Sequence, residues 1–419
     1  MKTAATGCLA LERSKIAIER LSRFRLFSDI SYAEMHPDIV GKVDPVIHFI
    51  GHGATEGRRA ARRTHIARIL GSLSRDILPH RDPKEFKSEL LDQPLNIGVF
   101  VSSLGNAFMT EIAAAIEELL RAAGHNVIKG DENSDIKERP EHCLFIAPHE
   151  FFFLGQGTRW VRDDVLATAC MYCTEQIQTK WFWQSLPIVL MAKSVVDVSA
   201  VTAAAYSEVM PSACISPAVG RKTTPIDPKA LTHPLLHGQR WWTEGQYNGD
   251  WVNRPLDLCF LGTVSPYRAR FFSRHAEKLS HYESFIYLRS GNARVPMNAA
   301  SDETLLPEVA QLVARNSRIL LNIHRDEFPY FEWHRLAYQG MANGCVVVSE
   351  PCFNDPEFQS GIHYLTEESH RLPELIDWLL NDPDGKDKAS AVVTTTTQAL
   401  QDTRTEALKA QTFFKILTV

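Results

Sequence analysis

One segment near the carboxyl end of the chain, residues 316–350, constrains the fold more than any other. An apolar run at residues 319–323 stops abruptly at the charged sequence His-Arg-Asp-Glu. A helix pattern follows over residues 330–342, and the next two residues, Asn-Gly, are a helix stop signal. Three valines at 346–348 then indicate a buried strand. The segment predicts a strand–loop–helix–strand unit with polar groups at the carboxyl end of a strand. Ligands bind there in open parallel sheets, and the helix start offers N–H groups to an anion.

Length and composition favour a two-domain globular enzyme. The chain has 419 residues, of which 44% are hydrophobic and 23% are charged. Two domains are the usual outcome at this length. The formal net charge of −5 gives no reason to expect a nucleic-acid partner. No apolar run is long enough to cross a membrane, and charges interrupt the amino-terminal apolar stretch, so we expect a cytoplasmic protein without a secretory signal.

The eight cysteines stand mostly in apolar surroundings, which is typical of reduced, buried thiols. Cys170 and Cys173 form a single C-x-x-C pair. A zinc site would need a second pair or suitably spaced histidines. A redox role stays open, but core packing is the favoured interpretation. No D-x-D motif follows a predicted strand, because Asp163-Asp164 and the Asp382–Asp384 stretch fall in loop or helix-start contexts.

Residues 1–90 form the first of three parts and are expected to be a helical module. The spacing of its prolines, glycines and charged residues resembles a short module found in some bacterial glycosyltransferases. The matching residues are Tyr32, Pro37, Asp38, Asp44, Pro45, His48, Phe49, Gly53, Glu56, Gly57 and Arg58. His48 and His52 are candidate ligands, although packing or capping is favoured because no cysteine or carboxylate is in register with them.

An arginine-rich helix is predicted over residues 57–70. Two interpretations stay open for it. The arginines form a solvated helix face, or they rest on an anionic membrane surface. The second interpretation would make the protein peripheral at the inner face of the membrane.

Residues 91–250 form the second part, which opens with a β-loop-α-β pattern. A strand at 95–101 is followed by a small-residue loop containing Ser103, Gly105 and Asn106, and then by a helix at 107–123. The loop is not G-x-G-x-x-G, so the nicotinamide-binding fingerprint is absent. We expect an α/β unit with ligand-binding groups at the strand's carboxyl end.

Two further strands of this part end in groups that suit acid–base chemistry. A strand at 143–147 precedes His149 and Glu150, and a strand at 167–172 precedes Glu175. Each of these residues alone is equally well explained as a cap of a helix or turn. Because two successive strand ends carry such groups, a reactive edge of the sheet is the favoured interpretation.

Residues 251–419 form the third part, a second β-α-β domain with a terminal helix. A strand at 255–261 leads into a loop that contains Gly262, Thr263 and Arg268. The preceding stretch, 226–254, is rich in proline, glycine, histidine and tryptophan and indicates a connector. Its tryptophans fit either sugar stacking or domain packing, and packing is favoured.

Two β-α-β domains, the second opening with F-L-G-T-x-S-x-x-R and closing with G-M-A-N-G-C-V-V-V-S-E, resemble the GT-B fold of nucleotide-sugar glycosyltransferases. The carboxyl-terminal half is similar to the group 1 family. The resemblance implies two Rossmann-like domains facing a cleft, with the acceptor on the first and the nucleotide sugar on the second. It also implies catalysis without a metal or other cofactor. The family often has a ribose-binding glutamate where this chain has Gln339.

The resemblance and the residue chemistry together define a set of candidate site residues. Arginine and helix N-termini suit the charge that builds on a leaving nucleoside diphosphate. A histidine or carboxylate suits the proton that an acceptor hydroxyl loses. The candidate catalytic residues are His149, Glu150 and Glu175. The candidate donor-binding residues are Ser103, Gly105, Asn106, Gly262, Thr263, Arg268, Asn322, His324, Arg325, Glu332, Arg335 and Gln339.

The sequence therefore predicts a glycosyltransferase that uses a UDP- or GDP-sugar and a glycan, lipid-linked or protein acceptor. Bacterial surface polysaccharide or glycoconjugate assembly is the expected setting, on the resemblance of the first part. Two alternatives remain. One is a nucleotide-sugar epimerase or hydrolase of the same fold. The other is a glycan- or partner-binding protein without catalysis, which Gln339 favours. The linkage, its stereochemistry and the oligomeric state stay open.

Overall fold

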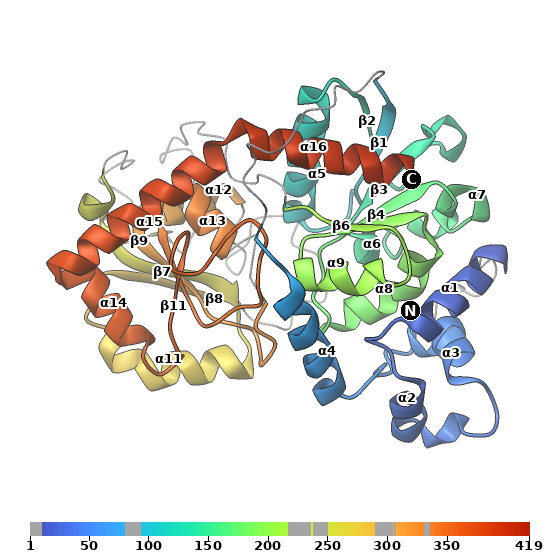
Figure 1. Cartoon of the computed structure of the whole chain (residues 1–419), viewed down its shortest axis with the longest axis horizontal. Helices are drawn as coiled ribbons and strands as arrows, with labels where there is room; N and C mark the ends of the chain where they lie inside the picture. The colour runs from blue at the N-terminus through green and yellow to red at the C-terminus, as the bar shows by residue number, and fades with distance from the viewer. Residues whose placement is uncertain are drawn as a thin grey trace.

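The structure is a computed structural model that describes residues 11–79, 94–216, 236–237, 250–289, 305, 307–330 and 336–419. A helical amino-terminal module is followed by two α/β domains, each built on a parallel sheet (Figure 1). This is the fold class expected from the sequence. Much of the connector expected at 226–254, including its first two tryptophans, lies outside the described residues.

The amino-terminal module is helical throughout its described part. Prolines and Asp44 start its short helices, since Asp44 accepts hydrogen bonds from the N–H groups of Val46 and Ile47. The helix expected from residue 57 begins instead at Arg63, because residue 57 ends a turn, the residues after it are irregular, and Arg62 is extended. The elements are α1 Leu11–Arg23, α2 Asp29–Met35, η1 Pro37–Ile39, α3 Pro45–His48, η2 Phe49–Gly53 and α4 Arg63–Asp76.

His48 is a packing residue, as favoured from the sequence. Its Nδ1 atom lies 2.9 Å from the hydroxyl of the buried Tyr32. The arginines of this module are largely paired. Arg58 contacts Asp38 and Glu56, which leaves less free positive charge for a membrane surface than the sequence suggested.

The first domain contains a parallel sheet of order β2-β1-β3-β4-β5-β6. Because β2 and β3 lie on opposite sides of β1, the strand order reverses between β1 and β3. Ligands bind at such a reversal in open α/β sheets. The strands are β1 Asn96–Phe100, β2 Asn126–Gly130, β3 His142–Ile146, β4 Ala169–Cys173, β5 Ser194–Asp197 and β6 Ser212–Cys214. The helices are α5 Ala107–Ala122, α6 Pro148–Phe151, α7 Asp163–Leu166, α8 Lys180–Met191 and α9 Ala200–Ser207, with 3-10 turns η4 Ile136–Glu138 and η5 Gly157–Trp160.

The second domain contains a parallel sheet of order β11-β10-β9-β7-β8, and its strand order reverses at β7 and β9. The sequence-predicted helix at 330–342 is shorter in its described part, since Tyr330 is not helical and α13 begins at Ala337. The strands are β7 Leu256–Thr263, β8 Ser284–Arg289, β9 Ser317–Asn322, β10 Val346–Ser349 and β11 Leu365–Thr366. The helices are η8 Trp251–Asn253, α11 Pro266–Leu279, α12 Pro307–Arg315, α13 Ala337–Ala342, α14 Leu372–Asn381, α15 Pro383–Gln401 and α16 Thr403–Thr418.

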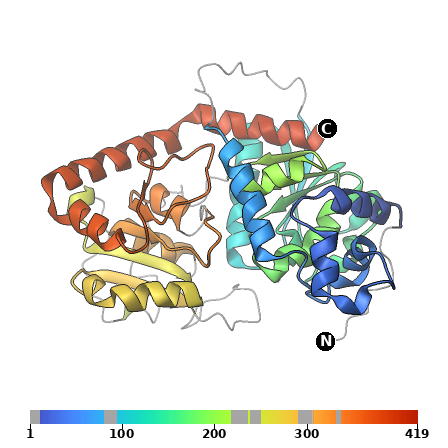
Figure 2. The ribbon, with the colours of Figure 1, turned by 60° about the horizontal axis from the view of Figure 1, so that its bottom comes forward.

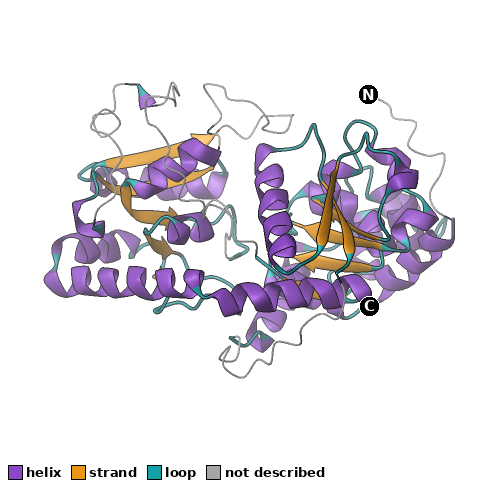
Figure 3. Cartoon of the chain, turned by 90° about the horizontal axis from the view of Figure 1, so that it is seen from above, coloured by secondary structure: helices purple, strands orange, loops and turns teal. Residues whose placement is uncertain are grey.

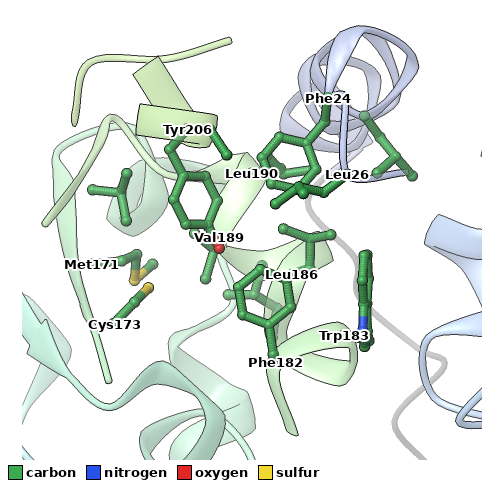
Figure 4. Close-up of a cluster of buried hydrophobic side chains, with 14 of the residues drawn as sticks. Phe24, Leu26, Met171, Cys173, Phe182, Trp183, Leu186, Val189, Leu190 and Tyr206 are labelled. Carbon is green, nitrogen blue, oxygen red and sulfur yellow. The ribbon is translucent and has the colours of Figure 1, made fainter. Parts of the chain in front are cut away.

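A continuous apolar core joins the amino-terminal module to the first domain (Figure 4). Phe24 stacks on Tyr206 of α9, with ring centroids 5.3 Å apart. Cys170 and Cys173 are buried in β4, and burial raises the pKa of both thiols. The structure therefore confirms core packing for this pair.

The terminal helix α16 returns to the first domain and keeps a contact with the second, where Lys409 pairs with Glu357 at 3.0 Å. Phe413 stacks on Tyr172 of β4, and Ser194 donates a hydrogen bond to the carbonyl of Ile416. Figure 3 shows α15 and α16 running along both domains in succession, and Figure 1 shows α16 beside the first sheet. The last helix thus ties the two domains together.

We predict that Phe413→Ala lowers the free energy of unfolding by about 3–5 kcal/mol, because its fully buried ring leaves a cavity against Tyr172. Denaturant unfolding measures the change. Lys415→Ala, on the exposed face of the same helix, is the matched control and should change stability by less than about 0.5 kcal/mol. Equal effects of the two substitutions would show that α16 is not seated on the first sheet.

Candidate active site

The strand ends at the reversal point of the first sheet are held together by Glu150. Its Oε2 atom accepts a hydrogen bond from the main-chain N–H of Asn106 at 2.9 Å. Asn106 caps α5 through its own side chain, which accepts from the N–H of Phe108. A side-chain carbon at Gly105 would stand 2.5 Å from the same Glu150 oxygen, so any larger residue here would displace this carboxylate. The loop after β1 and the start of α6 therefore form one unit.

Glu132 holds the other side of the loop that follows β1. It is buried and accepts hydrogen bonds from the N–H of Ser103 at 2.8 Å and from its hydroxyl at 2.6 Å. Burial acts to raise the pKa of Glu132, but the hydrogen bonds from Ser103 outweigh it and the pKa is lowered. Ser103 is thus engaged in holding the loop, a role that the sequence did not indicate.

The turn after β3 is strained. Ala147 has φ of +51°, the only positive φ at a non-glycine residue in the described part of the chain. A left-handed conformation costs roughly 1–3 kcal/mol for a residue with a side chain. The turn places Pro148, His149 and Glu150 at the start of α6, directly at the strand ends. Such strain concentrates where a side chain must be held for function.

The three candidate catalytic residues lie close together. The Nε2 atom of His149 is 3.4 Å from Oε1 of Glu175, which follows β4. His149 is 6% exposed. Burial raises the pKa of the neighbouring Glu150 carboxyl, against the effect of His149 and of the Asn106 hydrogen bond. A histidine next to a carboxylate can accept a proton, because the carboxylate stabilises the imidazolium that forms.

In the second domain Arg268 is buried and bridges two strand ends. Its Nε atom donates to the carbonyl of Ile323 and its Nη1 atom to the carbonyl of Thr263, both at 2.9 Å. The guanidinium also lies over the ring of Phe260. Gly262 packs against the same ring, since an added side-chain carbon would stand 2.6 Å from Phe260. Arg268 therefore positions the ends of β7 and β9. Its effect on a bound donor would act through these strand ends.

The residues at the end of β9 are buried with some of their polar atoms unpaired. Asn322 donates to the hydroxyl of Ser349 at 2.8 Å, and the Nε2 atom of His324 is 2.9 Å from the carbonyl oxygen of Pro351. Asn322 Oδ1 and His324 Nδ1 have no hydrogen-bond partner in the part of the chain that the structure describes. Glu350 accepts from the N–H of His324 and from the hydroxyl of Tyr267. These groups form a polar cluster at the reversal point of the second sheet.

Among the remaining donor-side candidates, Arg325 is exposed at the end of β9 and Gln339 is 5% exposed within α13. Glu332 and Arg335 lie outside the described residues. The sequence analysis missed the role of Arg63, which pairs with Asp326 at 3.0 Å and with Glu327 at 2.5 Å. No sequence signal could reveal this contact, since 263 residues separate Arg63 from Asp326. Glu350, in contrast, was visible as the first charged residue after the valine strand.

Helix α4 links the site loops of the second domain to the rest of the chain (Figure 2). Arg63 lies over the ring of Phe328, and Asn354 bonds to both the hydroxyl and the carbonyl of Ser74. The two domains also meet between α9, which follows β5, and the loop that follows β9, where the hydroxyls of Thr202 and Tyr330 are 3.5 Å apart. The carboxyl-terminal edges of both sheets therefore border one region.

The described residues contain no group of three or more histidine, cysteine, aspartate or glutamate side chains suited to a metal. Asp163 and Asp164 are engaged by the N–H of Arg13 and by the side chains of Arg139 and Arg162. Asp382 caps α15. Within the same part of the chain, no helix has the length and apolar character that a bilayer span requires.

The chain thus has two Rossmann-like α/β domains in the arrangement of the GT-B fold. No family model and no curated protein matches it. Similar solved structures include Anabaena Alr3699/HepE in complex with UDP and glucose, which has a TM-score of 0.46 and 10% identity over 77% of this chain and 99% of that one. T4 phage β-glucosyltransferase has a TM-score of 0.46 and 12% identity over 78% of this chain and 100% of its own. At these scores the likeness carries no argument about activity.

An α-glucosyltransferase in complex with UDP and a 13-mer DNA is also similar, with a TM-score of 0.48 and 11% identity over 78% of this chain and 100% of that one. That complex contains DNA, whereas the net charge of this chain predicts no nucleic-acid partner. The acceptor of this chain stays open.

We predict that Gly105→Ala lowers the free energy of unfolding by about 1–3 kcal/mol, because the new methyl group displaces the Glu150 carboxylate from the N–H of Asn106. Gly71→Ala in α4 is the matched control. Nothing lies within 4 Å of the added carbon there, so it should stabilise the protein by up to about 1 kcal/mol. Thermal or denaturant unfolding distinguishes the two, and a neutral Gly105→Ala would contradict the assigned contact.

Proposed function

We propose that the protein is a glycosyltransferase that moves a sugar from a nucleoside-diphosphate donor to the hydroxyl of an acceptor. The observation that carries the proposal is the pairing of His149 with Glu175 at the reversal point of the first sheet. The strand ends of the second sheet border the same region, as the contact between Thr202 and Tyr330 indicates. A base on one domain and an anion-binding edge on the other suit sugar transfer.

The chemistry follows from these positions. His149 accepts the proton of the acceptor hydroxyl, and Glu175 stabilises the imidazolium. The acceptor oxygen forms a bond to the anomeric carbon while the bond from that carbon to the diphosphate oxygen breaks. The diphosphate leaves with the bonding electron pair, and its charge needs fixed donors. This step describes an inverting transfer. In a retaining transfer His149 and Glu150 would position the acceptor.

On the donor side we assign the diphosphate to Arg325 and to main-chain N–H groups at the end of β9. Arg325 is exposed at the strand end, and guanidinium groups match phosphate oxygens. Glu332, Arg335 or Gln339, alone or together, are proposed for the ribose, because the family often has a ribose-binding glutamate at the position of Gln339. Asn322 and His324 are proposed to complete the donor site, because each has a buried polar atom available.

The finer parts of the proposal concern setting and cofactors. We propose transfer without a metal, a cytoplasmic location, and a role in bacterial surface polysaccharide or glycoconjugate assembly. The candidate donors are UDP- and GDP-sugars, and the candidate acceptors are glycans, lipid-linked sugars, proteins and DNA. Peripheral membrane contact has less support, since Arg62 and Arg63 pair with carboxylates of the chain itself.

Incubation with a panel of UDP- and GDP-sugars and acceptors, with and without a chelator, tests the proposal. Release of nucleoside diphosphate together with a new glycoside is the expected result. An epimerised donor, or sugar release without an acceptor, would assign an epimerase or a hydrolase. Calorimetry that detects no binding of any nucleotide would leave the non-catalytic alternative.

We predict that His149→Ala lowers kcat about a hundredfold or more and changes donor affinity by less than about threefold, since a general base acts on the acceptor. Steady-state kinetics and donor titration measure the two quantities. His52→Ala, an exposed histidine in the amino-terminal module, is the control and should leave both unchanged. Equal losses of kcat and donor affinity in His149→Ala would indicate a binding or folding role.

We predict that Arg325→Ala weakens the binding of UDP or GDP by about tenfold, because it removes charge-assisted hydrogen bonds to the diphosphate. The corresponding nucleosides, which lack phosphate, should bind equally well to both proteins. Arg68→Ala, an exposed arginine of α4, is the control. An unchanged affinity for the nucleoside diphosphate would remove Arg325 from the donor site.

A further inference from the structure

A pocket of about 890 Å³ lies in the second domain, away from the strand ends described above. It is bordered by the end of α11, by α14 and by the start of α15, and it reaches Asp257 near the beginning of β7. Asp257 precedes Thr263, at the carboxyl end of the strand, by six residues, which corresponds to about 20 Å at 3.3 Å per residue. The pocket is therefore separate from the candidate active site.

An exposed indole and a phenol ring line this pocket. Trp378 of α14 is 38% exposed, whereas its neighbours Ile376 and Leu379 are buried in the core. Helix α14 thus places one large apolar side chain in the pocket and not in the core. Tyr282 lines the same pocket beside the end of α11. Aromatic rings of this kind offer apolar faces next to polar tips, which suits ligands that are both apolar and hydroxylated.

Hydrogen-bond acceptors surround the two rings. Asp377 accepts from the hydroxyl of Tyr282 at 3.2 Å and from the side-chain amide of Asn381 at 2.7 Å, so it holds both groups in place. Glu374 and Asp382 also line the pocket. A carboxylate can accept several hydrogen bonds, and its free lone pairs remain available to a ligand that donates through hydroxyl groups.

The charge of the lining selects among ligands. The lining has four carboxylates, one lysine, Lys278, and one histidine, His281. Arg318 engages Asp257 and Arg371 lies 3.7 Å from Glu374, so Asp377 and Asp382 carry the remaining negative charge. This excess of negative charge disfavours phosphates, nucleic acids and acidic sugars. A neutral sugar has apolar C–H faces for the rings and hydroxyl donors for the carboxylates. The volume is within the range of small-molecule sites.

We propose that this pocket binds a neutral oligosaccharide and, given the proposed function, that it holds a remote part of a glycan acceptor. One glycan chain would then occupy the pocket and the transfer site together. Occupation of both sites raises the effective concentration of the reacting end, but only for chains that span more than the length of β7, about 20 Å. The acceptor class is therefore an extended neutral glycan.

Direct binding tests the pocket independently of turnover. Neutral cello-, malto- and chito-hexasaccharides are titrated into the full chain by calorimetry. At least one hexasaccharide should bind. Trp378→Ala should raise the dissociation constant of that complex about tenfold, because the stacking face is lost. Trp378→Phe keeps an aromatic ring and should restore most of the affinity. A hexasaccharide of uronic acids should bind more weakly than the neutral chain.

Trp181→Ala is the matched control, because Trp181 of α8 is 40% exposed but lies on the first domain beside Lys180. It should leave hexasaccharide binding unchanged. The proposal is overturned if none of the neutral hexasaccharides binds, or if Trp378→Ala and Trp181→Ala behave alike. It is also overturned if the uronic acid chain binds best.

Turnover separates this inference from the proposed function. Trp378→Ala should raise the KM for a long acceptor about tenfold, with no change for a disaccharide acceptor too short to span the two sites. Hexasaccharide binding without any transfer would contradict the glycosyltransferase activity and leave the pocket intact. Transfer with equal KM changes for long and short acceptors would contradict the remote anchor and leave the activity intact.

Discussion

The hydrogen bond from the main-chain N–H of Asn106 to the carboxylate of Glu150 is the contact on which the candidate active site depends. It joins the end of β1 to the turn after β3, and the absence of a side chain at Gly105 leaves room for it. The left-handed Ala147 shapes this turn and brings His149 next to Glu175. The buried Glu150, whose pKa is raised, thus holds the loop, while the adjacent His149 is the residue that we propose for proton transfer. Glu150 and His149 are equivalent candidates in the sequence but have different contacts in the structure.

In the second domain a buried cation, in place of a buried carboxylate, holds strand ends together. Arg268 binds main-chain carbonyls at the ends of β7 and β9, which would otherwise lose hydrogen bonds on burial. Because its donors are used in this way, the exposed Arg325 is the better candidate for contact with a diphosphate. The amino-terminal module adds to this arrangement through Arg63, whose partners are the two carboxylates that follow Arg325. Neutralising these carboxylates leaves Arg325 as the dominant charge of the loop.

The strand-and-helix order of both domains was predictable because apolar runs and glycine stop signals are local properties of the sequence. The convergence of Ser103, Gly105 and Asn106 with His149, Glu150 and Glu175 followed from the rule that parallel strands end at one edge. Contacts across long separations were not predictable. Neither the pairing of Arg63 with Asp326 nor the burial of Arg268 leaves a local pattern. The non-helical chain before Arg63 was predicted as helix, since an arginine-rich sequence suits both a helix and a loop. The β5 and β6 strands were also missed, because β5 directly follows the apolar helix α8 and β6 has only three residues.

The return of α16 to the first domain has a consequence for how the chain matures. The sheet that carries His149 is covered by Phe413, Ile416 and Leu417 of α16, which lie far beyond it in the sequence. During synthesis, domains fold as units from the amino terminus. The first domain therefore emerges with an apolar face that stays uncovered until α16 has been made. Nascent chains that have not reached α16 are candidates for chaperone protection.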